Sequence, residues 1–321
     1  MRIRPILSFV IAVSTAAVLY SQVPSADGPA NRQAPGQIGV SVLQVPLMVS
    51  VTDNKGKLIT NLTQKDFKIY EDDKLQTIRS FARDTDLPLS IALLLDSSGS
   101  VIDKLKFEQA AATDFFFNTI KRKKDRATVL GFDSTVQILS NETPDGFTDE
   151  PERLAEAVRK VRAGGGTAVF DAVYGAANKM LSRESGERRK LVIVISDGDD
   201  TASTKSLTEA LEMAQRHDIS IYAISTNRTS DTKRSEQVKG DDILQRMVDE
   251  TGGKAYFPLK LNDLASDFEK IGDELRSQYV ISYNPLNQNL DGSFRKVEVE
   301  MADKKYRART RKGYFAFRST N

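Results

Sequence analysis

The part of the chain that begins near residue 41 alternates between hydrophobic and polar positions. Every second residue from position 45 is a branched aliphatic one, namely Val45, Leu47, Val49 and Val51. The letters DNKG that follow are typical of a turn, and Phe67 and Ile69 repeat the alternation before an acidic turn. This pattern predicts antiparallel strands that bury one face and expose the other.

From residue 87 onward the hydrophobic positions form short, continuous runs instead. Four of these runs are rich in Val, Ile and Leu: SIALLLD, ATVLGFD, KLVIVISDGDD and ISIYAIST. Runs of this kind are typical of parallel strands that are buried on both faces. The segments between them have helical spacing, and the first carries Ile102, Leu105, Ala112, Phe116 and Ile120. Further helices are expected after Thr167 and over about 150–162, 204–216, 241–250 and 264–277. This alternation predicts an α/β fold, with a doubly wound, mostly parallel sheet and helices on both faces.

The alternating pattern returns after Gln278. The segments YVISYNP, FRKVEVEM and YRARTRKGYFAF resemble strands, and NLDGS resembles a turn. Each β flank alone is small for a hydrophobic core. We therefore predict one small antiparallel β-sandwich made from both chain ends (41–86 and 278–318), with the α/β domain (87–277) inserted between its halves. Two separate small β units are the alternative.

The first 25 residues have the layout of a secretory signal peptide. Arg2 and Arg4 precede an apolar stretch from Ile6 to about Tyr20, which is short for a membrane span. Residues 26–40 are rich in Pro, Gly, Ala and Gln, which predicts a flexible linker. We expect a secreted or periplasmic protein. The alternative is a protein anchored in the membrane by an uncleaved N-terminal segment.

The composition narrows the possible chemistry. The 321 residues include 46 Lys and Arg against 44 Asp and Glu, and this near balance gives no reason to expect a nucleic-acid partner. The absence of cysteine excludes disulfides, thiolate metal sites and cysteine nucleophiles. The single histidine, His217, excludes zinc sites that need two or three imidazoles.

Side chains that carry oxygen follow the predicted parallel strands. Asp96 ends the run SIALLL, Ser98 and Ser100 follow it, and Asp197 ends the run LVIVIS. Thr167 follows three glycines and precedes a helix. Because ligands bind beyond the carboxyl ends of parallel strands, we expect all five side chains at one edge of the sheet. Two carboxylates and three hydroxyls form an all-oxygen site suited to Mg²⁺, Mn²⁺ or Ca²⁺.

The same residues fit a purely structural or an enzymatic role less well. Asp96 and the two serines alone could be ordinary helix caps. A phosphatase of the haloacid dehalogenase type needs a second aspartate where Ser98 stands, and Ser98 as a nucleophile would need His217, which is expected at the opposite edge. The sequence AGGGT lacks the lysine of a phosphate-binding P-loop. A scaffold whose metal only braces loops stays open as an alternative, with a metal-dependent hydrolase behind it.

The motif DSSGS resembles the DxSxS motif of the von Willebrand factor type A domain. Thr167 in GGGT and Asp197 in ISDG resemble the two later elements of that domain's metal-ion-dependent adhesion site. The similarity covers about residues 88–277 and implies a Rossmann-like sheet, a divalent cation with Mg²⁺ preferred, and a protein partner that supplies an Asp or Glu. By this resemblance the metal-site residues are Asp96, Ser98, Ser100, Thr167 and Asp197. The protein is then expected to be a non-enzymatic, adhesion-type binding module.

The β flanks carry a second resemblance. The segments DFKIYED before the α/β domain, and YVISYNP, DGSFRKV and RKGYFA after it, are similar to those of von Willebrand A-related proteins of Acidobacteria. Near the C-terminus, Arg307, Arg309 and Arg311 are expected to line one strand face. That face would be either solvated or in contact with anionic components of a cell envelope.

Overall fold

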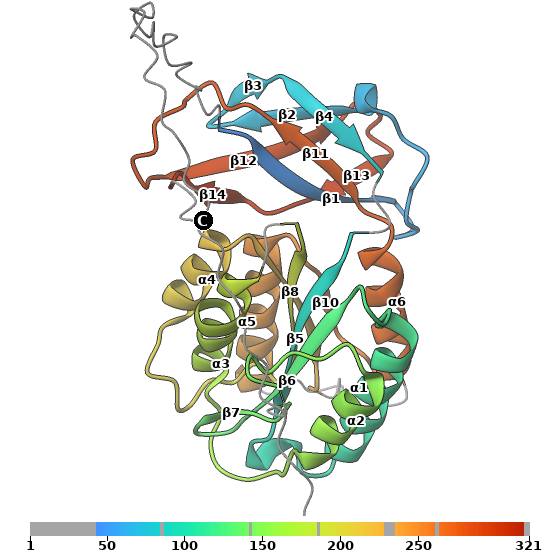
Figure 1. Cartoon of the computed structure of the whole chain (residues 1–321), viewed down its shortest axis with the longest axis vertical. Helices are drawn as coiled ribbons and strands as arrows, with labels where there is room; N and C mark the ends of the chain where they lie inside the picture. The colour runs from blue at the N-terminus through green and yellow to red at the C-terminus, as the bar shows by residue number, and fades with distance from the viewer. Residues whose placement is uncertain are drawn as a thin grey trace, which may run out of the picture. The chain divides into compact units, whose positions relative to one another are not determined.

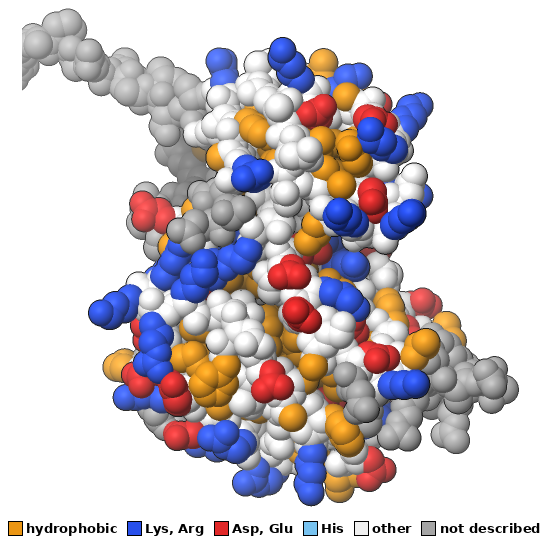
Figure 2. Space-filling view, turned by 90° about the vertical axis from the view of Figure 1, so that its right-hand side faces the viewer, with side chains coloured by type: hydrophobic (Ala, Val, Ile, Leu, Met, Phe, Trp, Pro, Cys, Tyr) orange, Lys and Arg blue, Asp and Glu red, His pale blue; other side chains and the backbone are white. Residues whose placement is uncertain are grey.

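The computed structural model describes residues 43–83, 87–140, 143–184, 187–227, 235–260 and 263–317. The predicted signal peptide (1–25) and linker (26–40) lie outside these residues. Among the helices of the described ranges, none combines the length and the apolar character needed to cross a membrane. On the face shown in Figure 2, positive and negative side chains are interspersed, with one gathering of Lys and Arg at mid-height.

A six-stranded sheet with the order β10-β9-β8-β5-β6-β7 forms the centre of the α/β part (Figure 1). Its strands are β5 (Leu89–Asp96), β6 (Arg126–Phe132), β7 (Val136–Ile138), β8 (Arg189–Ser196), β9 (Ile219–Ser225) and β10 (Ala255–Tyr256). All neighbours pair in parallel except β6 and β7. The four long strands are the four predicted runs. The short edge strands β7 and β10 were not predicted, because two or three residues carry too little periodicity.

Helices cover both faces of this sheet, which confirms the doubly wound fold. One face packs against α1 (Leu105–Thr119), α2 (Pro151–Lys160) and α6 (Leu264–Leu275). The other packs against α3 (Val169–Gly175), α4 (Leu207–Arg216) and α5 (Ser235–Thr251). Successive residues of β5 alternate between the two cores, with Leu93 in the first and Leu94 in the second. A strand buried on both sides is apolar along most of its length, which is why Ile91 to Leu95 of β5 form a continuous apolar run.

Two details of the helices differ from the prediction. Ile102 was expected on the apolar face of the first helix, but that helix begins at Leu105, after a short 3₁₀ turn over Gly99–Val101. Ile102 lies in the connection between them and is 64% exposed. The helix predicted over 241–250 begins six residues earlier, at Ser235. After α3 the chain continues through a π-helical turn (Ala176–Met180) and a 3₁₀ turn (Leu181–Arg183).

Strands from both flanks of the chain form a second, antiparallel part. Its sheets have the orders β13-β1-β11-β4 and β14-β12-β2-β3. The strands are β1 (Val45–Asp53), β2 (Phe67–Glu71), β3 (Lys74–Gln76), β4 (Ile78–Ala82), β11 (Tyr279–Tyr283), β12 (Phe294–Met301), β13 (Tyr306–Arg309) and β14 (Gly313–Phe315), with a 3₁₀ turn at Gln64–Asp66. Each sheet mixes strands from before and after the α/β part, and the two share one core. The alternative of two separate β units is therefore wrong.

The last predicted strand is in fact two strands that belong to different sheets. β13 pairs with β1, whereas β14 pairs with β12. The chain therefore crosses between the sheets at residues 310–312. An alternating pattern continues through such a crossing, so it cannot show where one strand ends.

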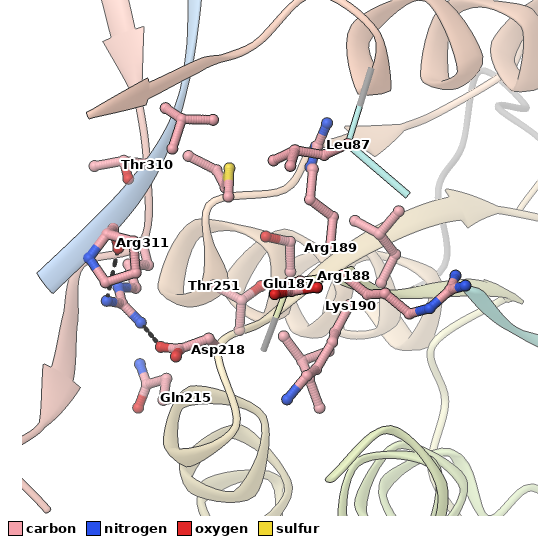
Figure 3. Close-up of a pocket in the computed structure, with 16 residues that line it drawn as sticks. Leu87, Glu187, Arg188, Arg189, Lys190, Gln215, Asp218, Thr251, Thr310 and Arg311 are labelled. Carbon is pink, nitrogen blue, oxygen red and sulfur yellow. Dashed lines mark hydrogen bonds and ion pairs between the residues drawn. The ribbon is translucent and has the colours of Figure 1, made fainter. Parts of the chain in front are cut away.

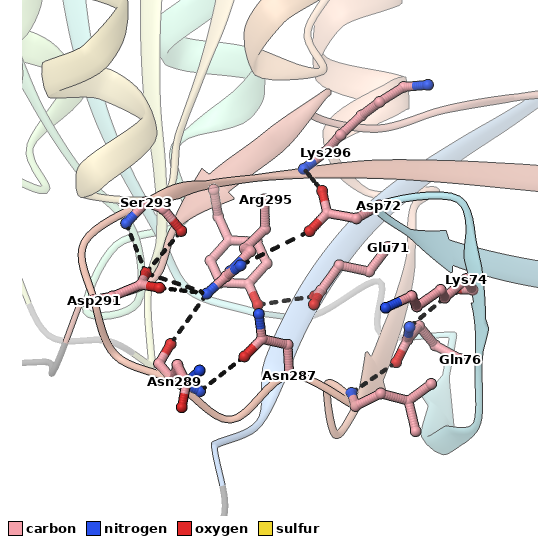
Figure 4. Close-up of polar contacts among 12 residues, drawn as sticks. Glu71, Asp72, Lys74, Gln76, Asn287, Asn289, Asp291, Ser293, Arg295 and Lys296 are labelled. Carbon is pink, nitrogen blue, oxygen red and sulfur yellow. Dashed lines mark hydrogen bonds and ion pairs between the residues drawn. The ribbon is translucent and has the colours of Figure 1, made fainter.

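Buried polar contacts join the two sheets of the sandwich (Figure 4). The Glu71 carboxylate on β2 accepts hydrogen bonds from the hydroxyls of Tyr283 at 2.7 Å and Tyr314 at 2.9 Å. Nearby, the predicted turn is closed by Arg295, whose guanidinium lies 3.1 Å from both Asp291 carboxylate oxygens. The Arg295 guanidinium thus lies within the loop that contains Asn287, Asn289 and Asp291.

A buried cluster around Glu274, at the end of α6, connects the α/β part to the sandwich. Its carboxylate accepts hydrogen bonds from Ser50 on β1 at 2.9 Å and Tyr222 on β9 at 2.7 Å, and forms an ion pair with Arg309 on β13. Burial alone would raise the pKa of Glu274, but the Arg309 charge and these hydrogen bonds outweigh it and lower the pKa. Arg311 likewise pairs with Asp218. Both sequence-based interpretations of Arg309 and Arg311 are therefore wrong, because these arginines bind the α/β part.

Candidate metal site

Asp96 ends β5 as a fully buried carboxylate at the carboxyl edge of the sheet. Its Oδ1 accepts a hydrogen bond from the Ser98 backbone N–H at 2.8 Å, and its Oδ2 accepts one from the Ser196 hydroxyl at 2.6 Å. Burial raises its pKa to about 6, and the charge of Asp197 adds to this, although the hydrogen bonds lower it. A buried carboxylate of this kind is stabilised by a nearby positive charge.

Three further side chains of the predicted set lie in direct contact beside Asp96. The Ser98 and Ser100 hydroxyl oxygens are 3.0 Å apart, and the Ser100 hydroxyl donates a hydrogen bond to Asp197 Oδ2 at 2.7 Å. Ser98 is buried, Asp197 is half-buried and Ser100 is exposed. The cluster therefore opens to solvent on the Ser100 side.

The loop that carries Thr167 is joined to the β5 loop through its backbone. The Gly164 N–H donates to the Ser97 carbonyl at 2.7 Å, and the Gly99 N–H donates to the Gly165 carbonyl at 3.2 Å. Gly165 has a φ of +79°, which favours glycine. Thr167 itself is buried, and within the described residues its hydroxyl makes no hydrogen bond. The structure thus places Thr167 on the expected edge with its hydroxyl available.

Close backbone packing holds the loop that carries Asp197. A Cβ on Gly240, in α5, would lie 2.1 Å from the Asp197 carbonyl oxygen, so only glycine fits there. The opposing Gly198 has a φ of +77°. The Asn227 side-chain amide donates to the same Asp197 carbonyl at 2.9 Å. Together these contacts fix the position of the Asp197 carboxylate.

Asp200 has a role that the sequence analysis did not identify. Its Oδ2 accepts hydrogen bonds from the Ser203 hydroxyl at 2.6 Å and from the Phe170 N–H, at the start of α3, at 3.1 Å. The Thr201 and Ala202 N–H groups donate to the Thr167 carbonyl, each at 2.9 Å. Asp200 thus helps to attach the Asp197 loop to the Thr167 segment.

A further carboxyl group lies buried close to this cluster. Glu108, on α1, is fully buried, and both of its oxygens lack a hydrogen-bond partner within the described part of the chain. Burial is the main cause that raises its pKa to about 8, followed by the negative charge of Asp96. Sequence analysis missed Glu108, although it shares the core-facing side of α1 with Ala111, Ala112 and Phe115. An acidic residue on an apolar helix face is the signal that could have revealed it.

The donor set consists of oxygen ligands that can hold a divalent cation. Among the described residues, no three His, Cys, Asp or Glu side chains converge to hold a metal ion. A cation at this edge would therefore be held by the Asp96 and Asp197 carboxylates together with hydroxyls, which are the ligands that Mg²⁺ and Mn²⁺ accept. The residues present fit such an ion.

His217 lies at the other edge of the sheet. It directly follows α4 and precedes the first residues of β9, whereas Asp96 ends β5. Because β9, β8 and β5 run parallel, His217 and Ser98 lie at opposite ends of these strands. The imidazole is therefore one strand length from Ser98, on the order of 20 Å. His217 therefore cannot serve as a base for Ser98.

Comparison with known families decides the classification of this arrangement. The family profile described as the von Willebrand factor type A domain matches residues 90–271, which is more than half of the chain. The chain belongs to the von Willebrand factor type A family. No curated protein sequence shows significant similarity to it.

One solved structure shares this fold at low sequence identity, and two others match with lower TM-scores. A von Willebrand factor type A protein from Catenulispora acidiphila is 14% identical with a TM-score of 0.51, and the match covers 82% of this chain and 71% of that one. Proximal thread matrix protein 1 from the mussel byssus, described with a zinc-occupied MIDAS motif, is 16% identical with a TM-score of 0.49, and the match covers 64% and 49%. An aerotolerance-related membrane protein from Bacteroides fragilis is 14% identical with a TM-score of 0.45, with coverage of 58% and 98%.

Gly240→Ala should distort the Asp197 loop, because the added methyl group would overlap the Asp197 carbonyl oxygen. We expect a loss of about 1–3 kcal/mol in the free energy of unfolding, measured by urea denaturation. Gly175→Ala is the matched control: its added Cβ meets nothing within 4 Å, and it should be neutral or stabilising by up to about 1 kcal/mol. Equal effects of the two substitutions would contradict the packing argument.

Glu108→Gln should change how stability depends on pH in protein kept free of metal by a chelator. Because the folded-state pKa is about 8, against 4.5 for an ordinary glutamate, the folded protein retains a proton that the unfolded chain releases. The free energy of unfolding therefore falls as pH rises from about 4.5 to about 8. The Gln variant lacks this decline, so it should gain stability over the parent between pH 5 and pH 9 in urea denaturation. A difference that stays constant with pH would contradict this assignment.

Proposed function

We propose that this protein is a non-enzymatic binding module that works outside the cytoplasm and binds a partner protein through a divalent cation. The contact of Ser98, Ser100 and Asp197 beside the buried Asp96 carries the proposal. Membership of the von Willebrand factor type A family supports it. The extracytoplasmic location rests on the secretory pattern of the first 25 residues.

The five motif residues have separate roles in this proposal. Asp96, Ser98 and Ser100 hold the cation, and Thr167 and Asp197 complete its shell directly or through water. The two carboxylates carry just enough negative charge to neutralise a divalent ion, and the three neutral hydroxyls add none. The bound cation supplies the positive charge to which a third carboxylate can bind. An Asp or Glu side chain of the partner would approach from the open, Ser100 side.

The donor set of two carboxylates and three hydroxyls suits Mg²⁺, Mn²⁺ or Ca²⁺, and the resemblance of its motif favours Mg²⁺. Mn²⁺ is close enough in coordination preference to serve as an alternative.

The competing proposal is a scaffold in which the cation only braces the loops. Protein contacts already brace them: backbone hydrogen bonds join Ser97 and Gly99 to the Thr167 loop, and Gly240 fixes the Asp197 backbone. A bracing ion would add little to loops held in this way. A metal-dependent hydrolase is the weaker alternative, and Ser98 cannot be its nucleophile with His217 as base, because the one histidine lies at the opposite edge from Ser98.

Calorimetric titration with Mg²⁺, Mn²⁺ and Ca²⁺ tests the site directly. We expect saturable binding by the parent and its loss in Asp96→Ala and Ser98→Ala, because each substitution removes a proposed ligand. Ser97→Ala is the matched control, since Ser97 lies in the same loop but outside the proposed ligand set. Absence of binding at millimolar metal, or equal losses in Ser97→Ala and Ser98→Ala, would refute the site.

Water-proton relaxation of the Mn²⁺-loaded protein separates partner binding from bracing. A cation with an open position carries an exchangeable water, so bound Mn²⁺ should enhance relaxation strongly. A short glutamate-containing peptide, used as a model carboxylate partner, should reduce this enhancement. The same peptide with glutamine in place of glutamate is the control. A Mn²⁺ site with no exchangeable water would support the scaffold and exclude the carboxylate bridge.

A further inference from the structure

A cavity of about 270 Å³ lies at the opposite edge of the sheet from the candidate metal site (Figure 3). Its upper wall comes from the outer face of the β1–β11 pair, where Met48 and Val280 stand opposite each other. Its lower wall comes from the starts of β8 and β9. The cavity therefore forms where the sandwich meets the amino ends of the parallel strands.

The walls of this cavity are largely apolar. The apolar side chains that line it are Pro46, Met48, Leu87, Leu191, Ile219 and Val280. Alternate residues of β1 explain this lining, since Leu47 and Val49 face the sandwich core while Pro46 and Met48 face the α/β part. An apolar cavity is poorly suited to ordered water and better suited to a ligand with an apolar body.

Cationic side chains outnumber carboxylates around the cavity. Four cationic residues line it, but the Arg188 guanidinium donates to the Leu89 and Lys124 carbonyls, and the Arg189 guanidinium donates to Leu275 and Gln278. Asp218 is paired with Arg311, as Figure 3 shows. The Lys190 ammonium makes no hydrogen bond or ion pair within the described residues, so it is the lining cation that can receive an anionic group.

Cationic groups at the cavity are partly desolvated. Burial lowers the pKa of Lys190, although the charge of Glu184 raises it, and burial lowers the pKa of Arg311 to about 10. Burial also lowers the pKa of His217, next to the cavity, and the charges of Lys190 and Arg216 lower it further. An anion in the cavity would offset the cost of holding these cations away from water.

We propose that this cavity binds a small amphipathic anion, a carboxylate with an apolar body, whose charged group faces Lys190 and whose apolar part contacts Met48 and Val280. A volume of about 270 Å³ lies just below the usual range for ligand sites, about 300–1,000 Å³, so the ligand is small. This site is independent of the proposed metal site, because the two lie at opposite edges of the sheet.

Isothermal titration of the full chain with sodium octanoate tests the proposal. We expect saturable binding at one site, with a dissociation constant on the order of 0.1–1 mM for an anion of this size. Octylamine hydrochloride has a chain of the same length and the opposite charge, and it should bind at least about tenfold more weakly. Absence of saturable binding up to about tenfold above this range, or equal binding of the two probes, would overturn the proposal.

Substitutions locate the binding within the cavity. Met48→Trp fills the space from the sandwich side and should abolish octanoate binding; Val280→Phe gives the same test from the neighbouring strand if the first variant does not fold. Lys190→Gln removes one charge while leaving the Arg311–Asp218 pair intact, and it should weaken binding about threefold to tenfold. Lys74→Gln, on the exposed strand β3, is the matched charge control and should change nothing. Unaltered octanoate binding by a folded cavity-filling variant would place the ligand elsewhere and refute this site.

Discussion

The structure depends on a carboxylate that is buried at the end of an apolar strand. Asp96 follows seven buried residues of β5 and is itself fully buried. Burying a charged carboxylate is unfavourable unless hydrogen bonds or an opposite charge compensate for it. Here the compensation comes from the Ser98 backbone, in the loop after β5, and from the Ser196 hydroxyl at the end of β8. The need to satisfy Asp96 therefore ties the β5 loop to the end of β8, where Asp197 stands.

The long strands and the position of Asp96 at the end of one of them could be predicted from the sequence. Continuous apolar runs identified the four long strands, and the rule that parallel strands present their carboxyl ends at one edge brought Asp96 and Asp197 together. Ser196, Glu108 and Gly240 could not be found in the same way. Their roles arise from contacts between segments far apart in the sequence, such as the approach of α5 to the Asp197 carbonyl. The alternation and spacing of apolar residues indicate which residues are buried. They do not show which segments contact one another in the fold.

The sandwich shows the same limit more clearly. Alternation predicted its long strands, and the small size of each flank argued that they share one core, as the structure confirms. The crossing between β13 and β14 went unpredicted, since residues 306–315 continue one alternating pattern across two sheets. Arg309 and Arg311 looked like a basic surface because nothing in the local sequence indicates Glu274 or Asp218 as their partners.

The order of elements explains why the candidate metal site faces away from the sandwich. The α/β part begins with a strand, β5, and ends with a helix, α6, so the chain enters and leaves it at the same, amino edge of the sheet. The Arg276 guanidinium donates to the Leu87 carbonyl at 3.2 Å, which places entry and exit side by side. A host domain formed from both flanks must then sit at the amino edge, where the Glu274 cluster and the apolar cavity lie. The carboxyl edge is left free of the host domain, because the loops that carry Asp96, Thr167 and Asp197 project from the other ends of the strands.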